Sequence, residues 1–153
     1  MRELVEETIT IIEPQAQERN IAVNKMLPQD NMTVIGDRTR LKQVLLNLAS
    51  NGVKYNRDHG CLDFVANCQE GQLQIAVRDT GVGIPPESMD KLFQRFYRVP
   101  GTENVIRGTG LGLNIAKSMV EAQGGEMLVE STVGVGTTFT IVLPLADSIV
   151  EPR

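Results

Sequence analysis

Residues 37–55 read DRTRLKQVLLNLASNGVKY, and this stretch decides the fold. Asp37 is a good N-cap, so we expect a helix that runs to about Tyr55. At about 100° per residue, such a helix has an apolar face and a neighbouring polar face. The apolar face carries Leu41, Leu45, Leu48 and Gly52, and the polar face carries Asn47, Asn51 and Lys54. The pattern predicts that one face packs on a core while the other borders a polar site.

Upstream of this helix, the sequence predicts another helix and two short strands. Apolar residues recur at helical spacing from the fourth residue onward, and a kinked helix could continue through Pro14 to about Arg19. The strands are expected at 21–26 and 32–36, around a polar turn at 28–31.

Downstream, the patterns predict two hairpins with a helix between them. The first hairpin has strands at 62–66 and 73–77 around Glu70-Gly71. The elements that follow are a short helix within 81–96, an irregular lid at 97–107, a helix at 111–123, and a hairpin with strands at 126–131 and 137–143. We expect the tail after Pro144 to be loosely ordered.

Helices and strands are interspersed here without regular βαβ units. The mixture predicts an α/β fold, a two-layer sandwich in which helices cover one face of a mixed β-sheet. With 153 residues, of which 41% are hydrophobic and 22% charged, the chain suits one domain with a sizeable core. We divide it into a first helix at 1–20, a main domain at 21–146 and a tail at 147–153.

Composition also narrows the partners and the compartment. The formal net charge of −4 argues against nucleic acid or an anionic membrane as the main partner. No apolar run is long enough for a membrane span, and there is no signal-like start. Cys61 and Cys68 lie on one predicted strand, too far apart for a disulfide, so we expect reduced thiols. We therefore expect a cytoplasmic domain without direct membrane contact, although a longer parent could be membrane-anchored.

Three short segments carry groups that suit one nucleotide site. They are Asn47-Leu48-Ala49-Ser50-Asn51 on the first-quoted helix, Asp79-Thr80-Gly81-Val82-Gly83 after a strand, and Gly108-Thr109-Gly110-Leu111-Gly112 before a helix. Together they supply a metal ligand, an adenine acceptor and a phosphate cradle, which are parts of one ATP site.

Asn51 is the candidate ligand for Mg²⁺. This ion takes oxygen ligands and keeps several waters, so one carboxamide oxygen with triphosphate oxygens suffices. Asn47 lies one turn earlier on the same face, and Lys54 would reach the phosphates as a point charge. Taken alone, the two asparagines read as solvated helix residues, and the other two segments favour the site.

Asp79 is the candidate acceptor for the base. Its carboxylate can accept a hydrogen bond from the exocyclic amine of adenine, whereas guanine presents a carbonyl at that position. Gly81 and Gly83 would let the backbone approach the base closely. The alternative is a turn aspartate that only caps the bend.

The glycines at 108–112 are the candidate phosphate cradle. They expose backbone N–H groups, and the following helix adds the partial positive charge of its N-terminus. Arg107, directly before them, could meet the terminal phosphate from the lid or be a solvated loop cation. Glycine loops are common, so this motif is weak when it stands alone.

In this combination and order, the chain resembles the catalytic ATP-binding domain of a bacterial-type sensor histidine kinase. That superfamily is shared with gyrase-type, chaperone and mismatch-repair ATPases. The resemblance implies the same sandwich fold, an asparagine box at 47–55, an adenine motif at 79–84, and glycine boxes at 108–113 and 134–139. The resemblance also implies further nucleotide-binding residues besides those already named: Tyr55, Ile84, Leu113 and Thr137.

Two further features bear on this resemblance. Residues 93–98 resemble the phenylalanine box, which would hinge the lid and pack it against the body. Phe93 and Phe96 also fit a plain amphipathic helix end. In the asparagine box, Gly52 stands where the family usually has alanine. A glycine inside a helix costs roughly 1 kcal/mol of stability relative to alanine. The departure puts local stability in doubt rather than nucleotide binding.

The resemblance implies transfer of the γ-phosphoryl group of ATP, with Mg²⁺, to a histidine on a separate dimerisation hairpin. A response regulator receiver domain would follow as the next partner. Asn47, Asn51 and Lys54 would be the catalytic residues. His59, the single histidine here, lies in a loop without the acceptor context, so we read it as a surface residue.

Two alternatives stay open. Hydrolytic relatives carry a glutamate at the position of Asn47, and an amide cannot take a proton from water. This favours a kinase over an ATPase. Steady ATP turnover by the isolated chain would instead support the ATPase. A non-catalytic nucleotide-binding module is the second alternative, and absence of ATP binding would support it.

Overall fold

The structure is a computed structural model that describes residues 1–100 and 112–148. Its helices are α1 (Arg2–Glu18), α2 (Arg38–Lys54), α3 (Pro86–Met89) and α4 (Gly112–Glu121), with a 3₁₀ turn at Ala146–Ser148. Its strands are β1 (Ala22–Met26), β2 (Cys61–Gln69), β3 (Gln72–Asp79), β4 (Glu126–Thr132) and β5 (Gly136–Pro144).

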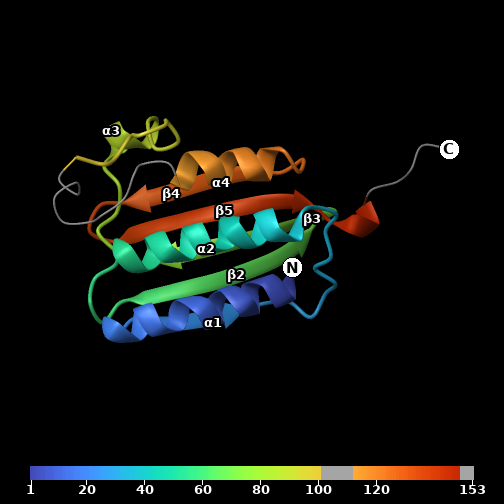
Figure 1. Cartoon of the computed structure of the whole chain (residues 1–153), viewed down its shortest axis with the longest axis horizontal. Coiled ribbons are helices and arrows are strands. Elements are labelled where there is room, and N and C mark those ends of the chain that lie inside the picture. Colours follow the sequence, from blue (N-terminus) through green and yellow to red (C-terminus); the bar gives the residue numbers. More distant parts are fainter. Residues whose placement is uncertain (101–111, 149–153) are drawn as a thin grey trace.

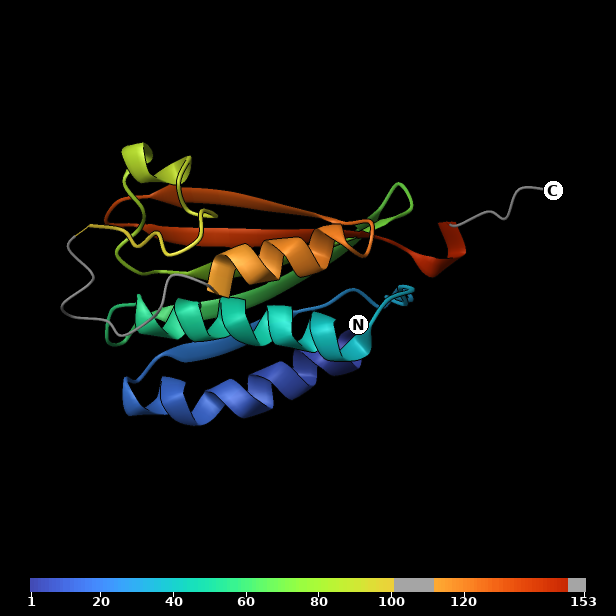
Figure 2. The same cartoon turned by 45° about the horizontal axis from the view of Figure 1, so that its top comes forward.

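The five strands form one mixed sheet in the order β1-β2-β3-β5-β4. β1 pairs with β2 in parallel, and the other neighbours pair antiparallel. Helices α1, α2 and α4 lie against the same face of this sheet (Figures 1 and 2). Buried positions alternate along β2, β3 and β5, as expected for strands with one covered face. The predicted two-layer sandwich is confirmed.

Helix α2 forms the centre of the helical layer. Asp37 caps its first turn by accepting a hydrogen bond from the Arg40 N–H at 3.1 Å. The predicted apolar face is buried: Leu41, Leu45 and Leu48 are at most 2% exposed. Gly52 faces β2, where an added Cβ would lie 2.5 Å from Cδ1 of Leu62. The glycine that looked costly in a helix therefore lets α2 approach the sheet closely.

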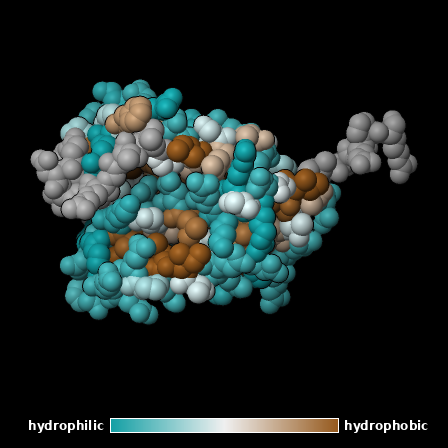
Figure 3. Space-filling view, in the orientation of Figure 1, coloured by the Kyte–Doolittle hydropathy of each residue, from teal (hydrophilic) through white to brown (hydrophobic). Residues whose placement is uncertain are grey.

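The surface of the helical layer is mainly hydrophilic, with a hydrophobic patch where α1 and α2 run side by side (Figure 3). Helix α1 contains Pro14 and continues past it to Glu18, as predicted. Across the described ranges, no helix combines the length and the apolar character that a membrane span requires.

The strand predicted at 32–36 is wrong. Val34 makes only an isolated bridge to Leu145, and the chain then turns toward α2. The turn brings the Asp37 N–H to within 2.6 Å of Oε1 of Gln123, just before Asp37 caps the helix. Because the chain turns here to place Asp37 at the start of α2, this segment does not continue as a strand.

The region just after Pro144 is also better ordered than predicted. The Leu145 N–H donates to the Gly71 carbonyl, and the Ala146 N–H donates to the Thr33 carbonyl, each at 2.9 Å. These bonds fix the chain against the β2–β3 turn and the loop before α2, so the expectation of a loose tail fails at this point.

Candidate nucleotide-binding site

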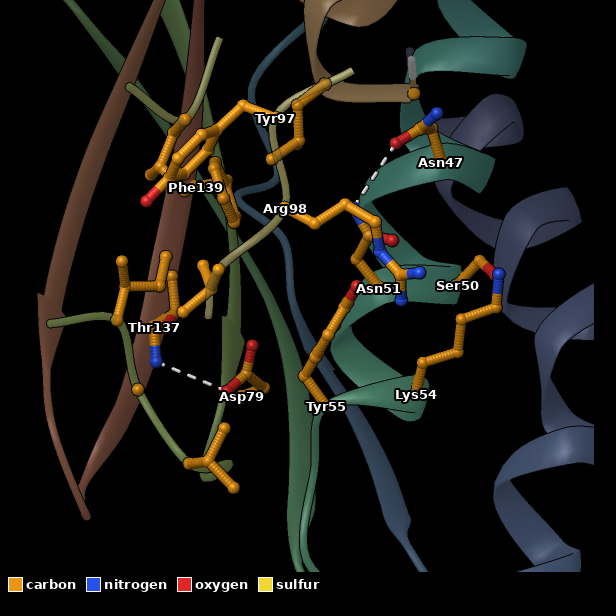
Figure 4. A pocket seen from close by; sticks show the side chains of 17 residues that line it. Asn47, Ser50, Asn51, Lys54, Tyr55, Asp79, Tyr97, Arg98, Thr137 and Phe139 are labelled. Atoms are coloured by element: carbon orange, nitrogen blue, oxygen red, sulfur yellow. Dashed lines mark hydrogen bonds between the residues drawn. The ribbon is translucent and has the colours of Figure 1, made fainter. Parts of the chain in front are cut away.

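A cavity of about 390 Å³ lies beside the C-terminal half of α2. This volume falls within the range of roughly 300–1,000 Å³ that is typical of small-molecule sites. Its walls come from α2, β3 and the loop after it, the segment 92–99, the start of α4, and β5 (Figure 4). The predicted site residues that line it are Asn47, Asn51, Lys54, Tyr55, Asp79, Gly83, Ile84, Gly112, Leu113 and Thr137.

Asp79 stands at the end of β3, opposite α2 across the cavity (Figure 4). The residue is 9% exposed, and its Oδ1 accepts hydrogen bonds from the N–H groups of Gly81 at 2.9 Å and Thr137 at 3.2 Å. Burial raises the pKa of this carboxyl above its ordinary value, and the two N–H donors partly oppose the shift. The loop after β3 and the start of β5 thus fix one oxygen of a buried acid beside the cavity.

Gly81 does not line the cavity, but close contacts explain why it is glycine. An added Cβ would collide with the carbonyl oxygen of Tyr55 and lie 2.9 Å from Oδ1 of Asp79. Gly83 has a φ of 75°, and a side chain there would run into the backbone of Thr132. The two glycines therefore allow the loop to fold tightly around Asp79.

The polar face of α2 forms the opposite wall. Asn47 and Asn51 are half-buried, and Lys54 is exposed. The Asn51 Nδ2 donates to Asn47 Oδ1 across 3.5 Å, so the amide of Asn51 turns its nitrogen toward the preceding turn of the helix (Figure 4). The spacing of three and four residues brings these side chains to one side of the helix, as the sequence predicts.

Helix α4 begins against this wall. An added Cβ at Gly112 would lie 2.5 Å from Nδ2 of Asn47, so a larger residue would displace the Asn47 amide. Gly112 and Leu113 line the cavity beside the asparagines. The other residues predicted for the phosphate cradle, namely Arg107, Gly108, Thr109, Gly110 and Leu111, lie outside the described residues, as does the lid from residue 101 onward.

The phenylalanine box packs only in part as predicted. Phe93 is half-buried against the core, with the Lys117 ammonium 4.8 Å from its ring centroid. Phe96 is 66% exposed and has a φ of 64°, so it points away from the body. The positive φ breaks the helical spacing on which the prediction of two packed rings depended.

Among the lining residues, the sequence does not assign Phe139 and Tyr97 to the site, and it leaves the role of Arg98 open between the phosphates and the partner domain. Phe139 lies two positions after Thr137 on β5, so the alternation of a strand could have indicated it. Arg98 extends across the cavity toward α2, and the Tyr97 hydroxyl donates to Ser88 Oγ at 2.8 Å (Figure 4). The short α3 thereby anchors the segment that covers the cavity, which local sequence pattern does not reveal.

The sequence model of histidine kinase-, DNA gyrase B- and HSP90-like ATPases matches residues 36–147, which is most of the chain. The chain belongs to this family. The predicted resemblance to this family is confirmed.

Relatives place the chain among the histidine kinases of this family. It is 38% identical over 144 residues to histidine protein kinase DivJ of Caulobacter vibrioides, covering 94% of this chain and 24% of DivJ. It is 41% identical over 134 residues to sensor histidine kinase WalK of Bacillus subtilis, covering 86% of this chain and 22% of WalK. The chain thus spans about a quarter of the length of these relatives.

Solved structures agree with this assignment. The catalytic domain of histidine kinase ThkA has a TM-score of 0.82 at 28% identity, covering 94% of this chain and 91% of that domain. Full-length ShkA in complex with AMPPNP has a TM-score of 0.81 at 30% identity, covering 93% of this chain and 29% of ShkA. The chain is a histidine kinase ATP-binding catalytic domain, as predicted.

Proposed function

We propose that this domain binds ATP together with Mg²⁺ and donates the γ-phosphoryl group to a histidine on a separate dimerisation hairpin. The observation that carries the proposal is the position of buried Asp79 and the polar face of α2 on opposite walls of one cavity. One wall suits a base and the other suits phosphates. Catalysis of phosphoryl transfer rests mainly on positioning and on neutralisation of charge, which these walls can provide.

Adenine is the base that fits Asp79. Oδ1 already accepts two backbone N–H groups, and no described residue donates to Oδ2. Oδ2 is therefore available to the exocyclic amine of adenine, in a charge-assisted hydrogen bond. Guanine would present a carbonyl oxygen to the carboxylate, and that repulsion would select ATP over GTP.

The oxygen donors of α2 fit Mg²⁺. The Asn51 amide turns its nitrogen toward Asn47, which leaves a carbonyl-type oxygen of the kind that Mg²⁺ prefers. Asn51 would hold the ion, Asn47 would orient the Asn51 amide, and Lys54 would contact the phosphates. The bound ion would supply neutralisation of charge on the phosphate oxygens.

The side chain of Asn47 favours a kinase over a hydrolase. An amide cannot act as a general base toward water, whereas a neutral imidazole is already nucleophilic near neutral pH, with an ordinary pKa of about 6.5. His59 is exposed and does not line the cavity, so it is poorly placed as an acceptor. The acceptor would therefore come from a separate part of the parent protein.

The relatives support the proposed partners. DivJ and WalK bear the names of histidine kinases. A solved structure of histidine kinase ThkA contains the response regulator protein TrrA, and this chain matches that kinase at 27% identity with a TM-score of 0.79. We extend this to a response regulator partner here. A cytoplasmic location follows from the need for ATP and suits the free thiols of Cys61 and Cys68.

The proposal is tested by supplying the missing acceptor. The domain is incubated with Mg-ATP, with and without the histidine-bearing hairpin of its parent protein. We expect the hairpin to acquire an acid-labile phosphoryl group, with negligible ATP turnover when the hairpin is omitted. Steady hydrolysis by the domain alone would instead favour an ATPase, and absence of ATP binding would indicate a non-catalytic module.

A further inference from the structure

Arg57 lies in the loop after α2 and joins two other loops. Its Nε donates to the carbonyl oxygen of Thr80 at 2.5 Å. Its Nη2 donates to the carbonyl oxygens of Gly134 at 2.7 Å and of Gly81 at 3.5 Å. Thr80 and Gly81 follow β3, whereas Gly134 belongs to the turn between β4 and β5. One exposed guanidinium therefore binds both loops at their backbones.

The same two loops hold the carboxylate of Asp79. Gly81, in the loop after β3, and Thr137, just beyond the β4–β5 turn, donate the two N–H groups that fix Oδ1. Arg57 contacts the carbonyl of Gly81 itself and a carbonyl three positions before Thr137. Arg57 does not line the cavity, so it can reach the base only through these loops.

The backbone of Arg57 is fixed in turn by Asn56, which is 4% exposed. The Asn56 Oδ1 accepts the Arg57 N–H at 2.9 Å and the Thr80 hydroxyl at 3.0 Å. The Asn56 Nδ2 donates to the Cys61 carbonyl at 2.9 Å. This buried amide, which makes three hydrogen bonds, holds the start of the Arg57 side chain against the loop that it binds.

Arginine suits this position better than other cations do. Its planar guanidinium presents several N–H donors in a rigid fork, whereas a lysine ammonium is a single point charge on a flexible stem. The loops also share contacts that do not involve Arg57: the Gly134 N–H donates to the Val82 carbonyl at 2.9 Å, and the Ile84 N–H donates to Ser131 Oγ at 2.8 Å. Loss of the guanidinium should therefore shift the loops without unfolding them.

We propose that Arg57 is a positioning residue that orients Asp79 and thereby sets the preference of this site for a purine that carries a 6-amino group. The proposal rests on the proposed function, because it requires Asp79 to accept the amine of adenine. It adds a specificity role for a side chain that touches neither the nucleotide nor the metal.

The test compares ATP with purine riboside triphosphate, which lacks the 6-amino group. Affinities are measured by calorimetry for the wild type, Arg57→Ala and Arg57→Lys. We expect Arg57→Ala to weaken ATP binding by roughly tenfold, the size of one modest hydrogen bond to a charged group. The analogue should lose less than about twofold, because it never engages Asp79. Arg57→Lys should fall between the wild type and Arg57→Ala for ATP.

Asp79→Asn separates this proposal from the proposed function. If Asp79→Asn alone leaves ATP affinity unchanged, the role of Asp79 as acceptor fails. If Asp79→Asn weakens ATP binding but Arg57→Ala still costs tenfold in that background, Arg57 does not act through Asp79 and the proposal is overturned. The expected result is that Arg57→Ala has almost no further effect once Asp79 is changed.

Arg38→Ala is the matched control. Arg38 is also an arginine at the surface, but it pairs with Glu7 and Glu3 at the opposite end of α2. We expect it to leave the affinities for both nucleotides unchanged. An equal loss of ATP and analogue binding in Arg57→Ala would also contradict the proposal, because a general loosening of the site does not discriminate between bases. Arg57→Lys supplies the same comparison if Arg57→Ala folds poorly.

Discussion

The two walls of the cavity differ in how completely the protein prepares them. At the base wall, Asp79 is 9% exposed, and Gly81 and Thr137 fix one of its oxygens. At the phosphate wall, Asn51 is half-buried, Lys54 is exposed, and the bond from Asn51 to its neighbouring asparagine spans 3.5 Å. The acceptor at the base wall is buried and held by a loop and a strand, whereas the described part of the phosphate wall is more exposed and loosely bonded.

This difference indicates a division of labour. A buried acceptor that is already oriented can discriminate between bases before any chemistry occurs, because its competing partners are fixed. Side chains that stay hydrated and loosely bonded gain their geometry when charged phosphates and a cation arrive. Under the proposed function, selection of the nucleotide would thus be part of the fold, and the bound nucleotide would help to organise the transfer of its phosphoryl group.

The largest expected effect lies at the phosphate wall. Asn51→Ala should lower phosphoryl transfer to a histidine-bearing partner by roughly a hundredfold or more, because a group that stabilises charge in the transition state is lost. Nucleotide binding in EDTA should persist, since the base wall is intact. Transfer is followed with labelled ATP, and Gln43→Ala, an exposed amide on the same helix, serves as the control. Undiminished transfer by Asn51→Ala would refute the metal role.

The next effect lies at the base wall. Asp79→Asn should weaken ATP binding by about 10- to 100-fold, as expected for loss of a hydrogen bond to a charged group, and should narrow the preference over GTP. Titration calorimetry with both nucleotides measures the change. Asp63→Asn is the matched control, because Asp63 lies on β2 and pairs with Asn24 away from the cavity. Equal losses for ATP and GTP would contradict base recognition by Asp79.

The raised pKa of Asp79 predicts a smaller effect, on stability. Because burial raises this pKa in the folded protein, folding favours the protonated acid. That contribution to the free energy of unfolding is present below the ordinary pKa of about 3.9 and is lost as the pH rises through the raised value. Without nucleotide, Asp79→Asn should therefore have a higher Tm than the wild type at pH 7.

The same variant tests the sign of this effect. The difference in Tm between Asp79→Asn and the wild type should shrink as the pH falls toward 4, because the wild-type acid becomes protonated as well. Thermal melts across this pH range check it, and Asp63→Asn again provides the comparison. A difference that grows toward acid pH would show that the ionised carboxylate stabilises the fold.

The smallest expected effect concerns the packing between the two walls. Gly52→Ala gains about 1 kcal/mol of helix propensity but crowds Cδ1 of Leu62, and overpacking of a core costs about 1–3 kcal/mol. We expect a net loss of about 1 kcal/mol in the free energy of unfolding, measured by denaturant titration. In the double variant with Leu62→Val the loss should be less than additive, since the crowded carbon is gone. Strict additivity would contradict the contact.

The parts of the site that could be predicted are those set by local periodicity. Asn47 and Asn51 share a helix face because they lie four positions apart, and Asp79 follows a strand that alternates cleanly. Phe139 could have been predicted in the same way, because it lies two positions after Thr137 on a strand and side chains alternate along a strand. In each case the covalent chain itself brings the residues to one side of an element.

The parts that could not be predicted depend on contacts between distant segments. The bond from Arg57 to Gly134 joins residues 77 positions apart, and neither residue type signals it. Val34 makes only an isolated bridge because the chain turns after it to place Asp37 at the start of α2. Phe96 has a positive φ, which turns its side chain outward. Local propensity does not report such constraints, since tertiary packing decides them.

The most direct measurement is the affinity of the domain for ATP and for GTP in EDTA, by calorimetry. Without metal, the phosphate wall lacks the ion that it would share with the nucleotide, so any preference must come from the base. We predict that ATP still binds at least roughly tenfold more tightly than GTP, because Asp79 is already oriented. Equal affinities in EDTA would contradict the claim that base selection is built into the fold.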